Sequence, residues 1–260
     1  MSATVAPAPV RPGPRAWAAL TAAEATVVAR DTAGLVVPLG MPVLILVMNG
    51  IAFDTAQVLP GTGGRTVFEI YVLPVTLALI ATLVGVVNMP SFLATYRRTG
   101  ILRRLAVTPA SPAMVLVAQA VVGVVQIALG MAVALAFAFW QFGAQGPAHA
   151  ATAAGALALT VAAMYAVGML VAAVAPTPQS AVAIGMVLFF AMGATGGMFG
   201  PRENLPDAVA TVGGVLPFGA ATHAIAAAWA GLPVPGSVLV SLVASTVVAG
   251  ALAALWFRWE

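Results

Sequence analysis

The sequence predicts an all-α polytopic membrane protein: six transmembrane helices, an N-terminal interfacial helix, a cytosolic coupling helix and an outer re-entrant helical hairpin between spans five and six. Hydrophobic residues make up 62% of the 260 residues and charged residues only 7%, against about 25% in an ordinary soluble domain. So few charges cannot cover the surface of a globular protein of this length. Apolar segments of about 20 residues, the length that crosses a bilayer as a helix, recur along the chain.

The six expected spans contain no Asp, Glu, Lys or Arg. Pro38 and Pro42 interrupt the first span and Pro74 the second, and we expect kinks there because a proline removes a helical hydrogen bond. The spans are residues 33–53, 70–90, 113–142, 150–174, 180–200 and 237–257.

The arginines indicate the orientation of these spans. An even number of spans places both termini on one side. If that side is the cytosol, eight of the ten arginines lie inside and only Arg65 and Arg202 outside. Short loops rich in Lys and Arg stay in the cytosol, so both termini are expected to be cytoplasmic. The formal charge of +3 then reflects membrane orientation, not a nucleic-acid partner.

Residues 1–15 are rich in proline and alanine and are expected to form a disordered cytosolic tail, followed by a single transmembrane domain over residues 16–260. Residues 16–32 have helix-forming composition, with Trp17 near their start. Because tryptophan prefers the membrane interface, we expect a helix lying on the inner surface, and a cytosolic extension of the first span is the alternative. The chain has no cysteine, which excludes disulfides and thiolate sites.

The segment between spans five and six is apolar yet broken by glycine and proline. Pro206 and Asp207 suit the first turn of a helix. Gly213 and Gly214 are expected to end that helix, and Pro217 can begin a second one. Each helix is too short to span a bilayer, so we expect a re-entrant hairpin in the outer leaflet. A surface loop packed on the spans is the alternative.

The absence of charge at membrane depth argues against several classes of protein. Carriers driven by protons or sodium generally bind the coupling ion through ionisable groups within the membrane, although backbone carbonyls can coordinate sodium. Channels need rings of charge or a carbonyl filter. The chain has no lysine, which excludes a G-x-x-x-x-G-K-[ST] nucleotide loop. Energy for uphill transport would therefore come from another chain that contacts the cytosolic side.

One cytosolic loop, residues 91–112, carries four of the ten arginines. Gly100 can separate the end of one helix from a short second helix, which Pro109 would end. Ser111 and Pro112 suit the start of the third span. The arginines point in several directions around such a helix and alternate with apolar side chains. This pattern favours docking into a partner protein, and a role limited to topology and lipid phosphate is the alternative.

Two stretches of the sequence resemble one family of membrane proteins. The first reads YRRTGILRRLAVTPASP and resembles the first coupling helix of type-2 ABC transporter permeases, R-x-x-G-x-[LIV]-x-R-[LI]-x-x-[TS]-P-x-[SP]. The second reads TGGMFGPRENLPDAVATVGGVLPFGAATHAI and resembles the stretch after the fifth span in that family. Their order on a six-span layout extends the resemblance over nearly the whole chain. The chain is most similar to the drug-exporter branch of the daunorubicin-resistance type, without a large extracellular domain.

The resemblance implies a permease in the bacterial plasma membrane that moves hydrophobic or amphipathic substrates, such as drugs, antibiotics or lipids, out of the cell by alternating access. It implies a homodimer with two ABC ATPase subunits, which would bind ATP and Mg. This chain would bind no cofactor or metal and have no ATPase site, and it would contact lipids but no nucleic acid. Residues 175–180 would form a secondary contact with the ATPase. The expected ATPase-coupling residues are Arg97, Arg98, Gly100, Ile101, Leu102, Arg103, Arg104, Leu105 and Pro109.

The resemblance also implies a substrate path along the second and fifth spans and an outer gate in the hairpin. For any one apolar residue of this path, contact with lipid or a neighbouring helix is the simpler interpretation. The glycines at 193, 196, 197 and 200 have small-xxx-small spacing, which the resemblance places near the dimer seam. The expected path residues are Thr76, Leu83, Asn88, Phe189, Phe190, Met192 and Thr195, and the expected gate residues are Pro201, Leu205, Pro206, Pro217 and His223.

Other polar residues have simpler interpretations. Glu69 suits a helix N-terminus as a favourable charge, and Gln119 and Gln126 can hydrogen-bond between helices. His149 and His223 are expected to be interfacial rather than metal ligands.

Two other functions remain open from the sequence. An intramembrane serine protease would need a serine in a G-x-S-x-G-like setting near a histidine on another span, and the sequence has no such setting. An ATP-independent lipid or solute carrier would need no partner ATPase.

Overall fold

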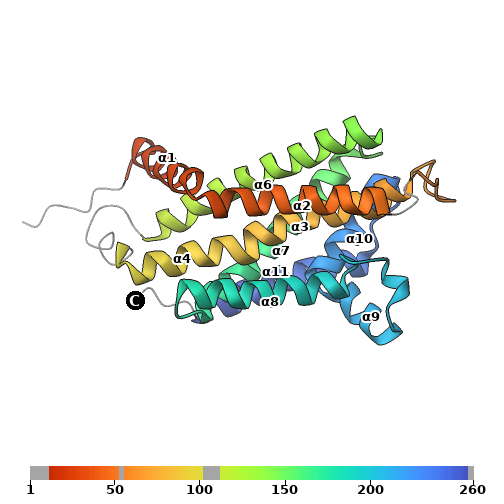
Figure 1. The fold of residues 1–260 in the computed structure, drawn as a ribbon. Helices are drawn as coiled ribbons and strands as arrows, with labels where there is room; N and C mark the ends of the chain where they lie inside the picture. The colour runs from red at the N-terminus through yellow and green to blue at the C-terminus, as the bar shows by residue number, and fades with distance from the viewer. Residues whose placement is uncertain (1–11, 53–55, 102–111, 257–260) are drawn as a thin grey trace, which may run out of the picture.

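The apolar segments of the sequence fold as helices that lie side by side (Figure 1). The computed structural model describes residues 12–52, 56–101 and 112–256. Within these ranges six helices are long and apolar enough to cross a membrane. The one strand-like pairing in the described part of the chain is an isolated bridge between Val58 and Thr66. The expected all-α, six-span architecture is confirmed.

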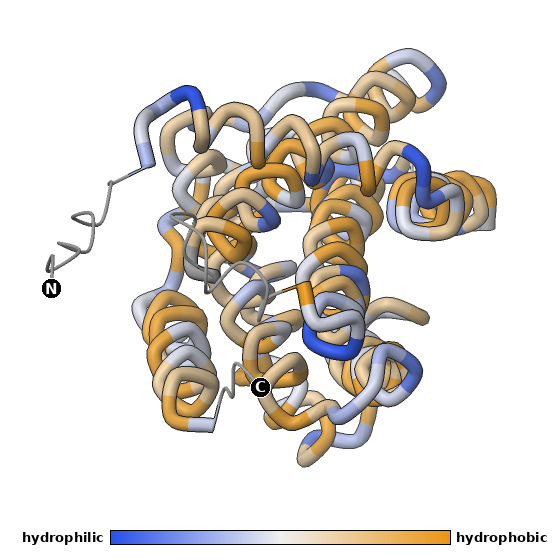
Figure 2. The backbone as a smooth tube through the Cα atoms, turned by 90° about the vertical axis from the view of Figure 1, so that its left-hand side faces the viewer, coloured by the Kyte–Doolittle hydropathy of each residue, from blue (hydrophilic) through white to orange (hydrophobic). Residues whose placement is uncertain are grey.

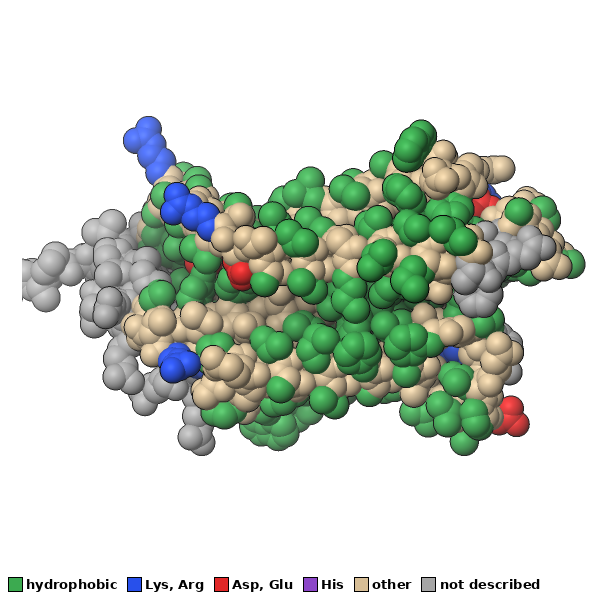
Figure 3. Space-filling view, in the orientation of Figure 1, with side chains coloured by type: hydrophobic (Ala, Val, Ile, Leu, Met, Phe, Trp, Pro, Cys, Tyr) green, Lys and Arg blue, Asp and Glu red, His purple; other side chains and the backbone are tan. Residues whose placement is uncertain are grey.

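The two ends of the bundle carry different elements (Figure 1). Helix α1 (Pro14–Arg30), the last turns of α4 (Met89–Arg98) and the start of α8 (Pro178–Thr195) lie at one end, named here the α1 end. Helix α9 (Asp207–Val215) lies at the other, named the α9 end. Charged side chains visible in Figure 3 lie toward these ends, with a hydrophobic band between them. A bilayer requires this distribution of charge.

Helix α1 is separate from the first span. It begins at Pro14, two residues before the expected start at residue 16, and ends at Arg30. The backbone at Asp31 is extended, and α2 (Thr32–Ala52) follows. Because the backbone changes direction at Asp31, α1 is not an uninterrupted extension of the first span.

The second span is longer than expected. It runs from Phe68 to Arg98 over 31 residues, so the expected end near residue 90 is wrong. A helix of that length is about 46 Å long at 1.5 Å per residue, whereas the hydrocarbon core is about 30 Å thick. The end of α4 therefore extends beyond the hydrocarbon region at the α1 end. Pro90 is accommodated inside this helix instead of ending it.

Prolines shape the second span through two wider turns. The span consists of η1 (Phe68–Val72), α3 (Leu73–Thr82), η2 (Leu83–Asn88) and α4, and both η segments are π-helical. Each π-helical segment ends two residues before a proline, Pro74 or Pro90. A proline ring clashes with the carbonyl group four residues earlier. A locally wider turn relieves this clash and lets the helix continue.

The second span lies at the centre of the bundle. In the most apolar 18-residue stretch of this span 89% of the residues are buried, against 28 to 44% in the corresponding stretches of the other five spans. Helices α2, α6 (Pro112–Phe142), α7 (Ala150–Val174), α8 and α10 (Pro217–Ala230) contact it, and α11 (Gly236–Trp256) packs on α7. Seen from the α1 end, the helices are hydrophobic over most of their length (Figure 2).

A glycine contact brings α7 close to the π-helical part of the second span. A Cβ atom added at Gly168 would lie 1.8 Å from the carbonyl oxygen of Gly85. Only a residue without a side chain allows this approach. Small residues at such contacts supply the van der Waals packing that holds membrane helices together.

The segment after the fifth span folds as a bent helix pair. The span ends at Thr195, five residues before the expected end at residue 200. A short 3₁₀ turn, η3 (Arg202–Asn204), precedes α9, and α9 and α10 meet at an angle of 80°. Helix α9 ends at Val215, one residue after the expected end at Gly213 and Gly214, and α10 begins at Pro217 as expected.

Close packing between helices explains why glycine occupies positions 196 and 213. A Cβ at Gly213 would lie 1.9 Å from the carbonyl oxygen of Thr195, and a Cβ at Gly196 would lie 2.5 Å from the Phe218 ring. Both glycines therefore join α8, α9 and α10 within one chain. Gly196 thus has an intrachain contact, and its expected place near a dimer seam stays a prediction.

Candidate functional site

A buried junction joins α1 to the end of α4 at the α1 end. The hydroxyl group of Tyr96 donates a hydrogen bond to the Glu24 carboxylate at 2.5 Å, and both side chains are buried. The Tyr96 ring also packs with Val115 of α6 and Leu20 of α1. Burial raises the pKa of Glu24, and the hydrogen bond from Tyr96 opposes this rise. Three helices thus meet at one tyrosine.

The next residue ties α4 to the start of the fifth span. Arg97 Nη2 donates to the carbonyl oxygen of Ala175, at 2.5 Å, directly after α7 ends. The side chain of Thr177 then caps α8, in a reciprocal capping box with Ser180. We name Glu24, Tyr96, Arg97 and Ala175 the α4 junction. It includes the first residue of the segment expected to be a secondary contact.

Four expected coupling residues lie in the described part of the chain. Arg98 ends α4 and is exposed, and Ile101 is 37% exposed. Gly100 has a φ of +72°, the left-handed region that glycine adopts readily. The expected break of the helix at Gly100 is therefore confirmed. The other five expected coupling residues lie outside the described ranges: Leu102, Arg103, Arg104, Leu105 and Pro109.

The expected path residues line none of the three best-formed cavities in the described part of the chain. Thr76 and Leu83 are buried within the chain's own core, and the Thr76 hydroxyl donates to the carbonyl of Val72. In this conformation neither residue reaches the surface, so their contact with a substrate stays a prediction.

The path residues of the fifth span point in different directions. Phe189 and Met192 are buried, whereas Phe190 is 42% exposed. The rings of Phe189 and Phe190 meet edge to face, with centroids 5.2 Å apart. Thr195 is half-buried, and its hydroxyl donates to the carbonyl of Ala191. The fifth span therefore exposes one of its expected path residues.

Asn88 binds a carbonyl group that a proline leaves free. Pro38 has no N–H, so the carbonyl of Gly34, four residues earlier, lacks its helical donor. Asn88 Nδ2 donates to this oxygen at 2.5 Å and Gln126 Nε2 donates at 2.7 Å. The expected interhelical hydrogen bond of Gln126 is confirmed. The position of Pro38 in the sequence could have indicated which carbonyl receives it.

A cavity at the α9 end includes two expected gate residues. Pro201 and His223 line a cavity of about 520 Å³, together with Arg202 and Tyr71, which the sequence reasoning missed. The hydroxyl of Tyr71 donates to the carbonyl of Gly197. This bond connects the second span to the turn after α8.

The other three gate residues lie on the hairpin away from this cavity. Leu205 is half-buried and Pro206 is exposed before α9. Pro217 begins α10 and is buried. The structure thus places the expected gate residues along one hairpin and brings two of them into one cavity wall.

Glu69 holds several elements together at the α9 end, a role that the sequence reasoning missed. Its carboxylate pairs with Arg65 Nη1 at 3.1 Å and accepts hydrogen bonds from the backbone N–H groups of Thr66 at 2.9 Å and Gln145 at 2.6 Å. The carbonyl of Gln145 accepts from Trp229 Nε1 at 3.1 Å. This set, named here the Glu69 network, links the start of the second span to the loop before α7 and to the end of α10.

Comparison with known families identifies the kind of protein that this fold belongs to. A family model described as ABC-2 type transporter matches residues 15–230, well over half of the chain. The match starts in α1, includes the long second span and the α4 junction, and ends with α10. None of the curated proteins compared with the chain matches it significantly.

The matched region therefore contains both the α4 junction and the hairpin. With six apolar helices, the chain is a multi-pass membrane protein. It belongs to the ABC-2 type transporter family and is a membrane-embedded permease component of an ABC transporter, a component that works with an ABC ATPase.

Proposed function

We propose that the chain is the permease subunit of an ATP-driven exporter in the bacterial plasma membrane, formed by two copies of this chain and two ABC ATPase subunits. The α1 end faces the cytosol and both termini are cytoplasmic. The distribution of arginines supports this orientation, because Arg15, Arg30, Arg97 and Arg98 lie at the α1 end.

The observation that carries the proposal is the α4 junction. The family match implies an ATPase that must act on the membrane helices from outside them. The second span extends beyond the hydrocarbon there, and consecutive residues bind two neighbours: Tyr96 binds α1 and Arg97 binds the chain before α8. A force applied after Gly100 therefore reaches α1, the second span and the start of the fifth span through direct contacts.

The second span can transmit such a movement because of its two π-helical segments. In η1 and η2 the helical hydrogen-bond pattern is already altered next to a proline. Such segments can rearrange without breaking the ends of the helix. Closure of the ATPase dimer on ATP would move α4, and the spans would change between inward-open and outward-open states.

The substrate is hydrophobic or amphipathic, as in drug, antibiotic or lipid exporters. The second and fifth spans carry no charge between Glu69 and Arg97 or between Pro178 and Thr195. A path without charged groups disfavours a strongly charged substrate and accepts apolar ones of different shapes. An amphipathic molecule with a large apolar ring system and a single amine, such as daunorubicin, is one candidate.

The proposal is tested by co-purification with the ABC ATPase encoded nearest to the chain, followed by reconstitution. Arg103→Ala with Leu105→Asp should abolish co-purification or ATP-driven uptake of daunorubicin into inside-out vesicles. Arg15→Ala, an exposed arginine outside the α4 junction, is the matched control. If vesicles with this chain alone accumulate the solute against its gradient, the ATPase is not the energy source and the proposal is wrong.

A further inference from the structure

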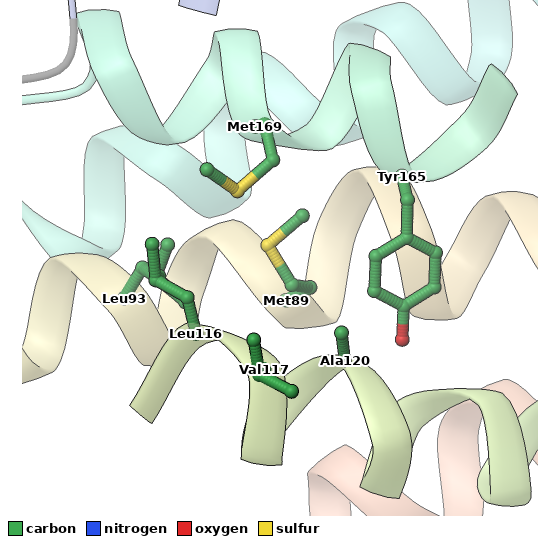
Figure 4. A pocket seen from close by; sticks show the side chains of 7 residues that line it. All are labelled: Met89, Leu93, Leu116, Val117, Ala120, Tyr165 and Met169. Atoms are coloured by element: carbon green, nitrogen blue, oxygen red, sulfur yellow. The ribbon is translucent and has the colours of Figure 1, made fainter. Parts of the chain in front are cut away.

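A second cavity at the α9 end, of about 430 Å³, has a charged group and several hydroxyl groups in its wall. Arg202 and His223 line it together with Gly214 of α9, and no acidic residue does. Three serines of α11 complete its polar lining: Ser237, Ser241 and Ser245. The smaller cavity of about 220 Å³ between α4, α6 and α7 has no charged side chain in its wall (Figure 4). The cavity along α11, unlike that one, can select a ligand by its charge.

The guanidinium group of Arg202 supplies this charge. It lies against α9 because Gly214 has no side chain: a Cβ atom added there would be 2.8 Å from Arg202 Nη1. The one ion pair between described side chains joins Arg65 to Glu69, so no described carboxylate neutralises Arg202. Arginine stays protonated in proteins and offers five N–H donors. A cation at the end of a membrane bundle attracts anionic groups of the lipid surface.

The three serines form a row of hydroxyl groups along one face of α11. They are spaced four residues apart, so they lie one above the other on the helix. The Ser241 hydroxyl donates to the carbonyl of Val215 and joins α11 to the end of α9. Within the described part of the chain, the hydroxyl groups of Ser237 and Ser245 form no hydrogen bond. These two residues are about 12 Å apart along the helix, so the cavity offers donors at two depths.

The cavity opens toward the lipid. Helix α11 begins at Gly236 near the α9 end and runs toward the α1 end (Figure 1). Ser237 therefore lies near the membrane surface and Ser245 deeper in the same leaflet. Two valines of the wall, Val215 and Val240, are 63% and 68% exposed. Because the polar groups of lipids occupy the interfacial layer above the hydrocarbon, a lipid can enter this cavity from the side.

We propose that this cavity binds an anionic glycerophospholipid of the leaflet at the α9 end. The phosphate group lies at Arg202 and Ser237, and an ester group of the lipid accepts a hydrogen bond from Ser245. The acyl chains pass over the exposed valines. This binding requires neither the ATPase nor transport, and it goes beyond the proposed export function.

The polar groups of the cavity match this class of lipid. The planar fork of an arginine donates two N–H groups to the oxygens of one phosphate. Serine hydroxyl groups can donate to phosphate or ester oxygens. A zwitterionic lipid has the same phosphate and esters, but its ammonium group would meet a wall that contains an arginine and no carboxylate. A lipid with a net negative head group, such as phosphatidylglycerol, is therefore preferred.

The test uses the full chain without an ATPase, in nanodiscs of phosphatidylcholine. A small fraction of phosphatidylglycerol or of phosphatidylcholine, with a diazirine next to one ester group, is photo-crosslinked in separate samples. Labelled peptides are identified by mass spectrometry. At residues 212–216 and 237–245 the phosphatidylglycerol should label about fivefold more, the factor expected for one arginine near the lipid surface. On the exposed surface of α6 near Leu129 and Val133 the ratio should be about one.

Two variants test the charge of Arg202. Arg202→Gln should reduce the ratio in the cavity to about one. Gly214→Ala keeps the charge but places a methyl group where Nη1 lies, so it should also lower the ratio. Arg15→Gln removes an exposed arginine at the other end and should leave the ratio unchanged. Unchanged labelling on α6 shows that each variant is folded.

Two further variants test the hydroxyl groups and the space. Ser237→Ala with Ser245→Ala should reduce labelling by both lipids and leave their ratio unchanged, because the phosphate and the esters are common to them. Ala244→Trp should fill the cavity and remove its label, since Ala244 lines this cavity and not the cavity of Pro201. Leu239→Ala changes an exposed position of α11 outside the cavity and should change neither value.

Three results would overturn the proposal. The first is a ratio of about one in the cavity of the wild-type chain, and the second is a ratio that stays near five in Arg202→Gln. The third concerns free phosphate, which shares the charge of the lipid but has no acyl chains. If excess inorganic phosphate removes the preference for phosphatidylglycerol, the cavity binds a free anion from water instead of a lipid.

Discussion

The Tyr96 hydroxyl and the Glu24 carboxylate form a buried hydrogen bond of 2.5 Å between residues 72 positions apart in the chain. It fixes α1 to the second span at the point where that span leaves the hydrocarbon. Because Arg97, the next residue, binds the chain before α8, any movement of this point displaces α1 and the fifth span together.

Replacing Tyr96 with Phe should weaken this attachment. Glu24 would stay buried without its donor, and an unpaired buried polar group costs about 1–3 kcal/mol. We expect a lower free energy of unfolding in mixed micelles and weaker coupling of ATP hydrolysis to transport. Tyr165→Phe is the matched control, since it removes a hydroxyl group that has no partner. Equal effects of the two variants on stability would contradict the role of the hydrogen bond.

The attachment of α1 should depend on pH through Glu24. Burial raises the pKa of this carboxyl group above its ordinary value of 4.5, so the folded state holds the proton more tightly than the unfolded state. The free energy of unfolding should therefore fall as the pH rises from 4.5 through the raised pKa. Glu24→Gln still accepts the hydrogen bond from Tyr96 but does not titrate. Across that pH range, the free energy of unfolding of the wild type should fall relative to that of this variant as the pH rises. A constant difference between the two would rule out Glu24 as the titrating group.

The six spans could be predicted from the sequence because each is a long apolar segment bounded by charge, glycine or proline. The α4 junction could not, since a buried glutamate in an amphipathic helix and a tyrosine near four arginines give no sign that they meet. The extended second span was missed for a local reason. Pro90 normally marks a helix end, and the π-helical turn that accommodates it has no clear sequence pattern.

The hydrogen bond from Gln126 to the Gly34 carbonyl should depend on Pro38. Gln126→Leu should reduce stability by about 0.6 kcal/mol, the average measured for hydrogen bonds between membrane helices, and by no more than about 1.7 kcal/mol. In a Pro38→Ala background, residue 38 supplies the helical N–H, so the same replacement should cost less. A double-mutant cycle of unfolding free energies measures this difference. Additive effects would show that the proline does not create the need for the side-chain donor.

The Glu69 network should behave as a buried ion pair. Replacing Glu69 with Leu leaves Arg65 buried without its partner, and breaking a buried pair in this way costs about 3–5 kcal/mol. The double replacement Arg65→Leu with Glu69→Leu removes both charges and should restore part of the lost stability. Asp207→Ala, which changes an exposed acid in the first turn of α9 at the same end, should cost no more than about 1 kcal/mol.

The same variants separate a structural role of the Glu69 network from a gating role. Glu69 also holds the N–H of Gln145, whose carbonyl binds Trp229, so its loss frees the loop before α7 from the end of α10. If opening at the α9 end requires this separation, the double variant should show more ATP-driven transport per folded molecule than the wild type, with the ATPase still bound. If transport instead falls in proportion to the amount of folded protein, the network only stabilises the fold.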